Sequence, residues 1–217
     1  MQSYFDLFDR PERTVRARFI ENYSNMNNGY IWAIEHSSGH SGSYSISDNI
    51  GYGAVITGQA NTGAWSEVFF ASGVPLKQFR QPCSCFAVTR MGCGSNLDAR
   101  IGLQDETIDS TNDRHWGAWN RWNWDNASDK VIFQTAQNNS TGDTATDLTI
   151  DENTHSNKIF IGLTTSQSSI DGILKATRDA ITPRTHGEAF QPRIMAESRA
   201  NETNRTFVVS YYEVWEN

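Results

Sequence analysis

The sequence is short of charged residues, of long apolar runs and of cysteine, and each shortage excludes a class of protein. Charged residues make up 20% of the 217 positions, and the net charge is −7. No cluster of Lys and Arg offsets this acidic balance, which excludes a nucleic-acid-binding surface of the usual basic kind. No apolar run approaches the roughly 18 residues that a membrane-spanning helix needs. Because 37% of the residues are hydrophobic and 12% aromatic, we expect a folded chain with a core.

The three cysteines are Cys83, Cys85 and Cys93. Cys83 and Cys85 alternate to the same strand face and are too close in sequence to bridge each other easily. A disulfide from either of them to Cys93 would leave one thiol over, and a three-thiolate metal site would lack the paired C-x-x-C spacing of zinc sites. We expect buried free thiols, with one disulfide as the first alternative and a metal site as the second.

Helical patterns are also scarce. No segment carries an apolar stripe at i, i+3, i+4 and i+7 over twelve residues, whereas short alternating runs recur between turn-rich gaps. Two predicted hairpins join 51–58 to 64–71 and 84–91 to 98–104. Two further predicted pairs join 115–125 to 130–136, before a polar loop, and 157–165 to 172–176. The remaining predicted strands are 13–20, 29–36, 193–198 and 205–215. About a dozen strands without a repeat period predict an all-β fold, with residues 1–217 in a single domain of two packed antiparallel sheets.

The segment 115–125 contains four of the seven tryptophans. In a strand, its side chains alternate between two faces. One face would be mostly apolar and would line the core, with Trp116, Ala118, Asn120, Trp122 and Trp124. The other face would combine an aromatic ring with charged and amide groups, the chemistry that holds a sugar, and it would carry His115, Trp119, Arg121, Asn123 and Asp125. The alternative is that all four tryptophans serve core and hairpin packing.

Short motifs along nearly the whole chain resemble those of the concanavalin A-like lectin/glucanase jelly roll. They are DLFDRP at 6–11, GAVITGQANTGAWSEV at 53–68, FAVTR at 86–90 with ARIGLQ at 99–104, IFIGL at 159–163 with IDGIL at 170–174, and VVSYYEVW at 208–215. The resemblance implies a single-domain β-sandwich jelly roll with little helix. It leaves the function open, because this fold hosts lectins, glycanases, lyases, adhesion domains and virion modules.

Catalytic motifs are missing from the predicted strands. The retaining glucanases that the chain resembles carry E-x-D-x-E or E-x-D-x-x-E, which places two carboxylates about 5 Å apart, and neither spacing occurs here on a strand. The single carboxylates on separate predicted strands are Glu35, Glu67, Glu197 and Glu213. Two of them could meet across a sheet, or each could be a solvated, outward-facing residue. Lyase, nucleophile-elbow and phosphate-loop motifs are absent as well.

A candidate calcium site lies in the acidic segment 105–113. Asp105, Asp109 and Asp113 supply the carboxylate oxygens that Ca²⁺ prefers, as in the lectins that the chain resembles. The alternative is a solvated acidic loop. We expect no cofactor to be required, with Ca²⁺ as the one candidate.

Three functions remain for the chain. The first is a non-catalytic, lectin-like carbohydrate-binding module at a virion or cell surface, whose partner is a glycan or glycoprotein. The second is a structural protein that assembles with itself or with virion proteins, with its tryptophans in protein contacts. The third is a polysaccharide hydrolase or lyase. The opening MQSYFD has no signal-peptide pattern, so we expect a virion component kept in the cytosol during synthesis, or an extracellular module whose signal has been removed.

Overall fold

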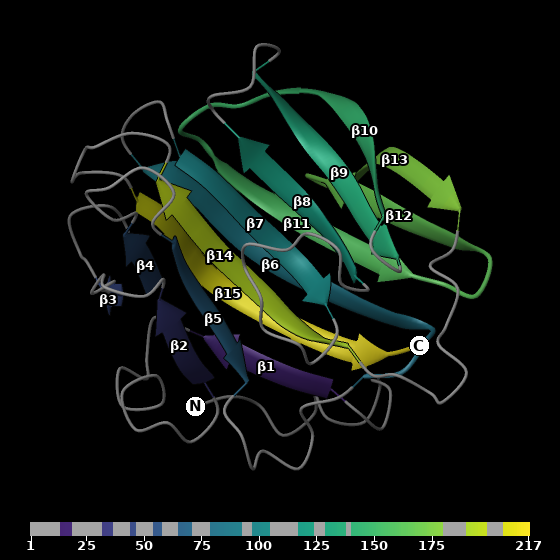
Figure 1. The fold of residues 1–217 in the computed structure, drawn as a ribbon, viewed down its shortest axis with the longest axis horizontal. Helices are drawn as coiled ribbons and strands as arrows, with labels where there is room; N and C mark the ends of the chain where they lie inside the picture. The colour runs from purple at the N-terminus through teal and green to yellow at the C-terminus, as the bar shows by residue number, and fades with distance from the viewer. Residues whose placement is uncertain are drawn as a thin grey trace.

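A computed structural model describes residues 14–18, 32–36, 44–46, 54–57, 65–70, 79–92, 97–104, 117–123, 129–137, 140–179, 190–198 and 206–217. These residues form fifteen strands in two antiparallel sheets (Figure 1). The described part of the chain contains no helix that is long and apolar enough to cross a membrane. The predicted all-β sandwich is confirmed.

One sheet has eight strands, in the order β13-β12-β11-β6-β15-β4-β3, and β1 also pairs with β15. The first described strand therefore lies beside the last (Figure 1). The strands are β1 (Thr14–Arg18), β3 (Tyr44–Ile46), β4 (Ala54–Thr57), β6 (Cys83–Gly92), β11 (Thr154–Ile161), β12 (Thr165–Ile170), β13 (Ile173–Asp179) and β15 (Thr206–Glu216).

The second sheet has seven strands, in the order β10-β9-β8-β7-β14-β5-β2, so β7, β8 and β14 lie side by side at its centre (Figure 1). The strands are β2 (Trp32–His36), β5 (Trp65–Phe70), β7 (Leu97–Gln104), β8 (Gly117–Asn123), β9 (Lys130–Gln137), β10 (Ser140–Thr149) and β14 (Gln191–Ser198).

The hydrophobic core fills the space between the sheets and follows from the alternation of apolar residues along each strand. On β7 the core residues are Leu97, Ala99, Ile101 and Leu103; on β8 they are Ala118 and Trp122. Trp122 therefore lies in the core as predicted, whereas Trp116 and Trp124 lie outside the described residues. Cys83 and Cys85 are buried free thiols, as expected, and burial raises the pKa of Cys85 to about 12.

Two predicted hairpins are wrong. β4 and β6 belong to the eight-stranded sheet, whereas β5 and β7, which follow them in the chain, belong to the seven-stranded sheet. Each connection thus crosses from one sheet to the other. The alternation of side chains could not reveal this, because a strand buries the same apolar face whichever sheet it joins.

The region between 137 and 172 also differs from the prediction. The polar segment predicted as a loop contains β10, an edge strand on which Thr141, Asp143, Asp147 and Thr149 are exposed. β12 lies between β11 and β13 and pairs with both, so the predicted direct pairing of 157–165 with 172–176 is wrong. The Asp171-Gly172 turn is confirmed. Its φ angles of 52° and 77° suit a two-residue hairpin loop between paired Ile170 and Ile173.

Candidate functional site

The outer face of the seven-stranded sheet, opposite the core, carries a set of polar side chains on its central strands. On β8, Ala118 and Trp122 point into the core, so Trp119 and Arg121 point to the other face. The pairing register places residues of β7 and β9 beside Trp119 and Arg121, and residues of β14 on the far side of β7. We call this set the outer-face cluster; its members are Asp98, Arg100, Gln104, Trp119, Arg121, Gln134, Arg193 and Glu197.

Trp119 is the aromatic centre of the cluster and is fully buried. Its Nε1 donates to Oε1 of Gln134 at 2.8 Å. The guanidinium carbon of Arg193 lies 4.6 Å from the ring centroid, which is a cation–π contact. Gly102 pairs with Trp119 on the neighbouring strand, and a Cβ there would lie 2.5 Å from the Cα of Trp119. The backbone of β8 and the Cβ of Trp119 therefore occupy the space that a side chain on Gly102 would take.

Asp98 is the anionic centre of the cluster and has no exposed surface. Arg121 donates to it through Nε at 3.0 Å and through Nη2 at 2.7 Å, and Arg100 donates through Nη2 at 3.2 Å. Arg100 also lies 3.8 Å from Oε2 of Glu197. Two arginines thus share one buried carboxylate, a geometry that fixes both guanidinium planes.

Burial and the charge of Asp98 shift the pKa of Arg100 and Arg121 in opposite directions. Burial lowers the pKa of Arg100, although the charge of Asp98 opposes this. Burial also tends to lower the pKa of Arg121, but the charge and hydrogen bonds of Asp98 outweigh it and the net pKa is raised. Since an arginine side chain is effectively always protonated, both remain cations beside Asp98.

Arg193 connects the aromatic part of the cluster to its amide groups. Besides the contact with Trp119, its Nη1 makes a short hydrogen bond to Oε1 of Gln104, and its Nη2 lies 3.4 Å from the sulfur of Met195. Gln134 in turn donates to Oδ1 of Asp143 at 2.8 Å. The cluster is therefore a continuous network from β14 to β10, made of guanidinium, amide, carboxylate and indole groups.

A buried polar network on the outer face of a sheet is unusual for a sandwich, because the core does not require it and desolvating polar groups costs free energy. The rim of the network is accessible. The side chains of Arg121 and Glu197 are 16% and 14% exposed, and Asn123 is half-buried. These rim groups can donate and accept hydrogen bonds to a polar ligand without unfolding the network.

The structure brings together three of the five predicted ligand-binding residues, Trp119, Arg121 and Asn123, on one face of β8. His115 and Asp125 lie outside the described residues. Trp119 has no exposed surface, so ligand contact with its ring requires the atoms that cover it to move. Its role in binding, like that of the other four, stays a prediction.

The predicted metal-ligating residues Asp105, Asp109 and Asp113 also lie outside the described residues, so the calcium site stays a prediction. Within the part of the chain that the structure describes, no group of three or more His, Cys, Asp or Glu side chains could hold a metal ion.

Most of the cluster was not predicted from the sequence, although the alternation of residues along two strands carried a signal for it. β7 alternates apolar residues with Asp98, Arg100, Gly102 and Gln104, and β14 places Arg193 and Glu197 at the same period. Polar residues on the outer face of a sheet are ordinary, so the alternation alone did not distinguish a buried network from a solvated face.

The structure changes the interpretation of some of the four glutamates that the sequence places singly on separate strands. The register pairs Glu35 with Glu67 and Glu67 with Met195, so two of the four are cross-strand neighbours. Glu213 is 4% exposed and accepts a hydrogen bond from the Tyr211 hydroxyl at 2.9 Å. The alternative of a solvated, outward residue is therefore wrong for Glu213.

The two packed sheets have the jelly-roll fold of concanavalin A-like lectins and glucanases, which confirms the fold that the resemblance implies. Crh5 transglycosylase matches over 94% of this chain and 84% of its own, with a TM-score of 0.69 and 14% identity. The carbohydrate recognition domain of Emp46p matches over 92% and 94%, with a TM-score of 0.64 and 7% identity. An endo-β-1,3-glucanase from Pyrococcus furiosus matches over 93% of both chains, with a TM-score of 0.65 and 12% identity.

These similarities establish the fold. At 7–14% identity they do not establish the function, which has to be argued from the residues of the site. No protein-family model matches the chain, and no curated protein matches it.

Proposed function

We propose that the chain is a non-catalytic carbohydrate-binding module whose ligand contacts the rim of the outer-face cluster. The observation that carries this proposal is the buried network around Asp98 and Trp119, which the sandwich itself does not need. Bidentate arginines and amides suit sugar hydroxyls, and a network that is already ordered loses little entropy when a ligand binds. Arg121, Asn123 and Glu197 would make the first contacts.

The structural neighbours add support of a general kind. The Emp46p neighbour is a carbohydrate recognition domain, and Crh5 was solved in complex with NAG. Two neighbours that handle glycans on the same architecture make a glycan a reasonable first ligand class for this chain. At 7–14% identity they do not indicate which glycan.

The test is a glycan array followed by titration calorimetry. We expect wild-type protein to bind at least one glycan class. Arg121→Lys keeps the charge opposite Asp98 but loses the bidentate fork, and we expect it to weaken binding by about tenfold, since one charge-assisted hydrogen bond is worth about 1.5 kcal/mol. Asn123→Ala should weaken binding as well.

A tryptophan pair provides the matched control. Trp119→Phe removes the indole N–H that Gln134 accepts, whereas Trp215→Phe alters a half-buried tryptophan of the eight-stranded sheet. We expect only the first to reduce affinity, with both proteins folded by circular dichroism. No binding by wild type on a broad array, or equal binding by wild type, Arg121→Lys and Asn123→Ala, would count against the proposal.

A second candidate function is glycan hydrolysis, favoured by the pairing of Glu35 with Glu67 next to β14. Two carboxylates on neighbouring strands are the minimum for acid–base cleavage of a glycosidic bond. Release of reducing ends from soluble β-glucans, abolished in Glu67→Gln, would establish this activity and replace the non-catalytic proposal.

The location and the metal belong to the proposal as well. We place the module at a virion or extracellular surface, where glycans and assembly partners are met; light scattering of the purified protein tests self-assembly. Repeating the calorimetry with EDTA and with added Ca²⁺ tests the acidic segment 105–113, because a calcium-dependent site loses affinity with the chelator.

A further inference from the structure

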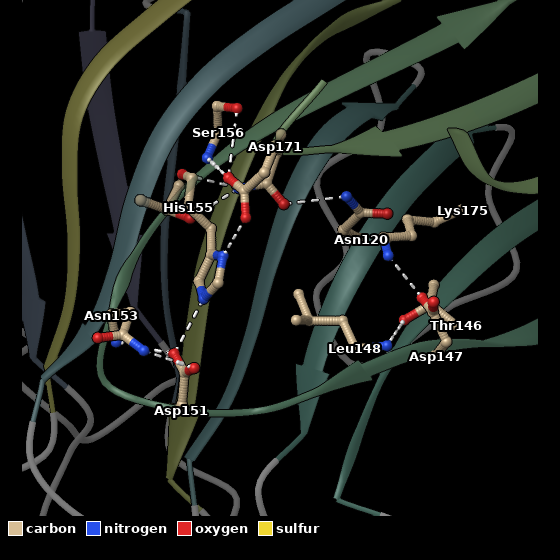
Figure 2. Close-up of polar contacts among 12 residues, drawn as sticks. Asn120, Thr146, Asp147, Leu148, Asp151, Asn153, His155, Ser156, Asp171 and Lys175 are labelled. Carbon is tan, nitrogen blue, oxygen red and sulfur yellow. Dashed lines mark hydrogen bonds and ion pairs between the residues drawn. The ribbon is translucent and has the colours of Figure 1, made fainter. Parts of the chain in front are cut away.

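His155 lies between two carboxylates that come from different parts of the chain (Figure 2). Its Nδ1 is 2.6 Å from Oδ2 of Asp171, and its Nε2 is 2.9 Å from Oδ1 of Asp151. The imidazole is 8% exposed and packs on Trp122, with ring centroids 5.2 Å apart and an interplanar angle of 36°. Both ring nitrogens therefore face an acceptor. We call Asp151, His155 and Asp171 the histidine clamp.

The clamp joins elements of both sheets. Asp151 lies in the connection from β10 of the seven-stranded sheet to β11 of the eight-stranded sheet. Asp171 lies in the β12–β13 turn, where its Oδ1 also accepts from the backbone N–H of Ser156 at 2.8 Å (Figure 2). Trp122 belongs to β8. A single imidazole thus holds a turn, a crossover and the core together.

The protonation state of His155 decides how many of these contacts exist. A neutral imidazole carries one N–H and donates to one carboxylate, whereas an imidazolium donates to both. In the neutral ring, the second nitrogen would direct a lone pair at a carboxylate oxygen less than 3 Å away. The geometry with two short contacts is therefore that of the protonated ring.

Among the described residues, the charged groups that contact His155 are the two carboxylates of the clamp. β6 presents Thr89 opposite His155, β8 presents Trp122, β7 presents apolar core residues, and β12 has no charged residue of its own. Burial lowers the pKa of His155, but the hydrogen bonds and charges of Asp151 and Asp171 outweigh it, and the net pKa is raised. No described neighbouring cation opposes the proton.

We propose that the histidine clamp is a pH-sensitive latch on the β12–β13 hairpin, closed on both carboxylates while His155 is protonated and loosened, with one of its two hydrogen bonds lost, when His155 loses its proton. The inference does not depend on carbohydrate binding. It concerns the titration of one imidazole at the end of the sandwich where the β12–β13 turn meets the crossover between the sheets.

Loosening of the latch would affect β13, whose side chains contact the seven-stranded sheet. β13 carries Lys175, whose Nζ lies 2.8 Å from Oδ1 of Asp147 on β10. It also carries Arg178, which donates to the hydroxyls of Thr135 and Thr144 at 2.9 and 2.8 Å. These side chains tie β13 to the seven-stranded sheet, while the pairing of β12 with β11 and the hydrogen bond from the Asp171 N–H to the Ser156 carbonyl hold the hairpin in its own sheet. Loss of the Asp171 side-chain contact would therefore raise local opening of the hairpin while the core remains folded.

The first experiment measures the pKa of His155 and the local opening of the β12–β13 hairpin separately. A ¹H–¹³C NMR titration of the wild-type protein gives the pKa of His155, and hydrogen exchange, corrected for its intrinsic pH dependence, gives the opening of 165–179. We expect a pKa above the ordinary value of about 6.5, and opening that rises about tenfold per pH unit from there to the folded pKa and then levels off.

Asp171→Asn is the most informative variant. Asparagine accepts a positive φ, and its carbonyl oxygen still accepts from Ser156, so the turn is kept while the charge is lost. We expect the pKa of His155 to fall and the exchange step to move to lower pH. His155→Gln should remove the step altogether. Asp147→Asn is the matched control, because it removes a nearby carboxylate that does not contact His155. Loss of its ion pair with Lys175 should raise the opening alike at every pH, and the position of its pH step should match that of the wild type.

Two results would overturn the proposal. One is a His155 pKa at or below the ordinary value in the wild-type protein. The other is exchange in 165–179 with the same pH dependence in wild type, Asp171→Asn and Asp147→Asn. Because Asp171→Asn retains the backbone contacts of the turn, the second result stays interpretable even if His155→Gln fails to fold.

Discussion

At the scale of single residues, two glycines on opposite faces of the seven-stranded sheet differ in what limits the space beside them: Gly102 is on the outer face and Gly142 faces β13 of the other sheet. Beside Gly102, the nearest atoms to an added Cβ belong to the backbone and Cβ of Trp119 and to the backbone of Ala118. Beside Gly142, they belong to the guanidinium of Arg178, with its Cζ 2.6 Å away. The first obstacle is a fixed strand and the second is the end of a flexible side chain.

We therefore expect Gly102→Ala to be much more destabilising than Gly142→Ala. Overpacking against a central strand costs about 1–3 kcal/mol or more, and it should shift the tryptophan fluorescence because Trp119 must move. Gly142→Ala should cost about 1 kcal/mol, the worth of the hydrogen bonds that Arg178 gives up. Urea unfolding followed by fluorescence measures both. Equal costs for the two variants would show that Trp119 is not confined by Gly102.

At the scale of elements, β8 carries different kinds of polar side chain on the two faces of its sheet. Its outer face holds Trp119 and Arg121, whereas Asn120 points between the sheets. The amide of Asn120 donates to Oδ1 of Asn157 on β11 at 3.0 Å and accepts from Ser168 on β12 at 2.6 Å. Asn157 in turn donates through its Nδ2 to the hydroxyl of Thr89 on β6 at 2.8 Å. A buried polar bridge thus ties β8 to the opposite sheet and fixes their relative position.

Removing one end of this bridge should cost more than its hydrogen bonds are worth. Asn120→Ala leaves Asn157 and Ser168 buried without that partner, and we expect a loss of about 1–3 kcal/mol in the free energy of unfolding. A double-mutant cycle with Asn157→Ala should give a coupling energy above about 0.5 kcal/mol. Additive effects would mean that the two amides do not act as a unit.

At the scale of the whole molecule, the histidine clamp makes stability depend on pH from two sides. The hydrogen bond to His155, against the effect of burial, lowers the pKa of Asp151 and Asp171. Their contribution is therefore present above the unfolded carboxyl pKa of about 3.9 and is lost as the pH falls through the folded values. The raised pKa of His155 gives a contribution that is present below about pH 6.5 and is lost as the pH rises through its folded pKa.

The difference in unfolding free energy between wild type and His155→Gln should accordingly be largest between about pH 4 and 6.5 and should shrink toward pH 9. Urea titrations of both proteins at several pH values measure it. The imidazole also packs on Trp122, and the loss of that packing adds an offset that does not change with pH. A difference that is constant, or that grows with pH, would contradict the assigned proton.

Much of the architecture was predictable because it follows from local alternation. The all-β class, the strand positions from 84 onward except β10 and β12, the burial of Trp122 and the turn at Asp171 each depend on a side-chain period or a turn signal within a few residues. The two wrong hairpins depend on which sheet a strand joins. That choice is set by packing against distant strands, which no local pattern encodes.

For the sites, the sequence by itself determined which side chains share a face of a strand, and so it placed Trp119, Arg121 and Asn123 together. Only the tertiary structure decided that β7 lies between β8 and β14, that Arg193 covers the ring of Trp119, and that two arginines share Asp98. The same holds for His155, which meets one carboxylate four residues away and another sixteen residues away. Contacts between strands depend on sheet order and register, and these are fixed by the burial of the whole core rather than by any one segment.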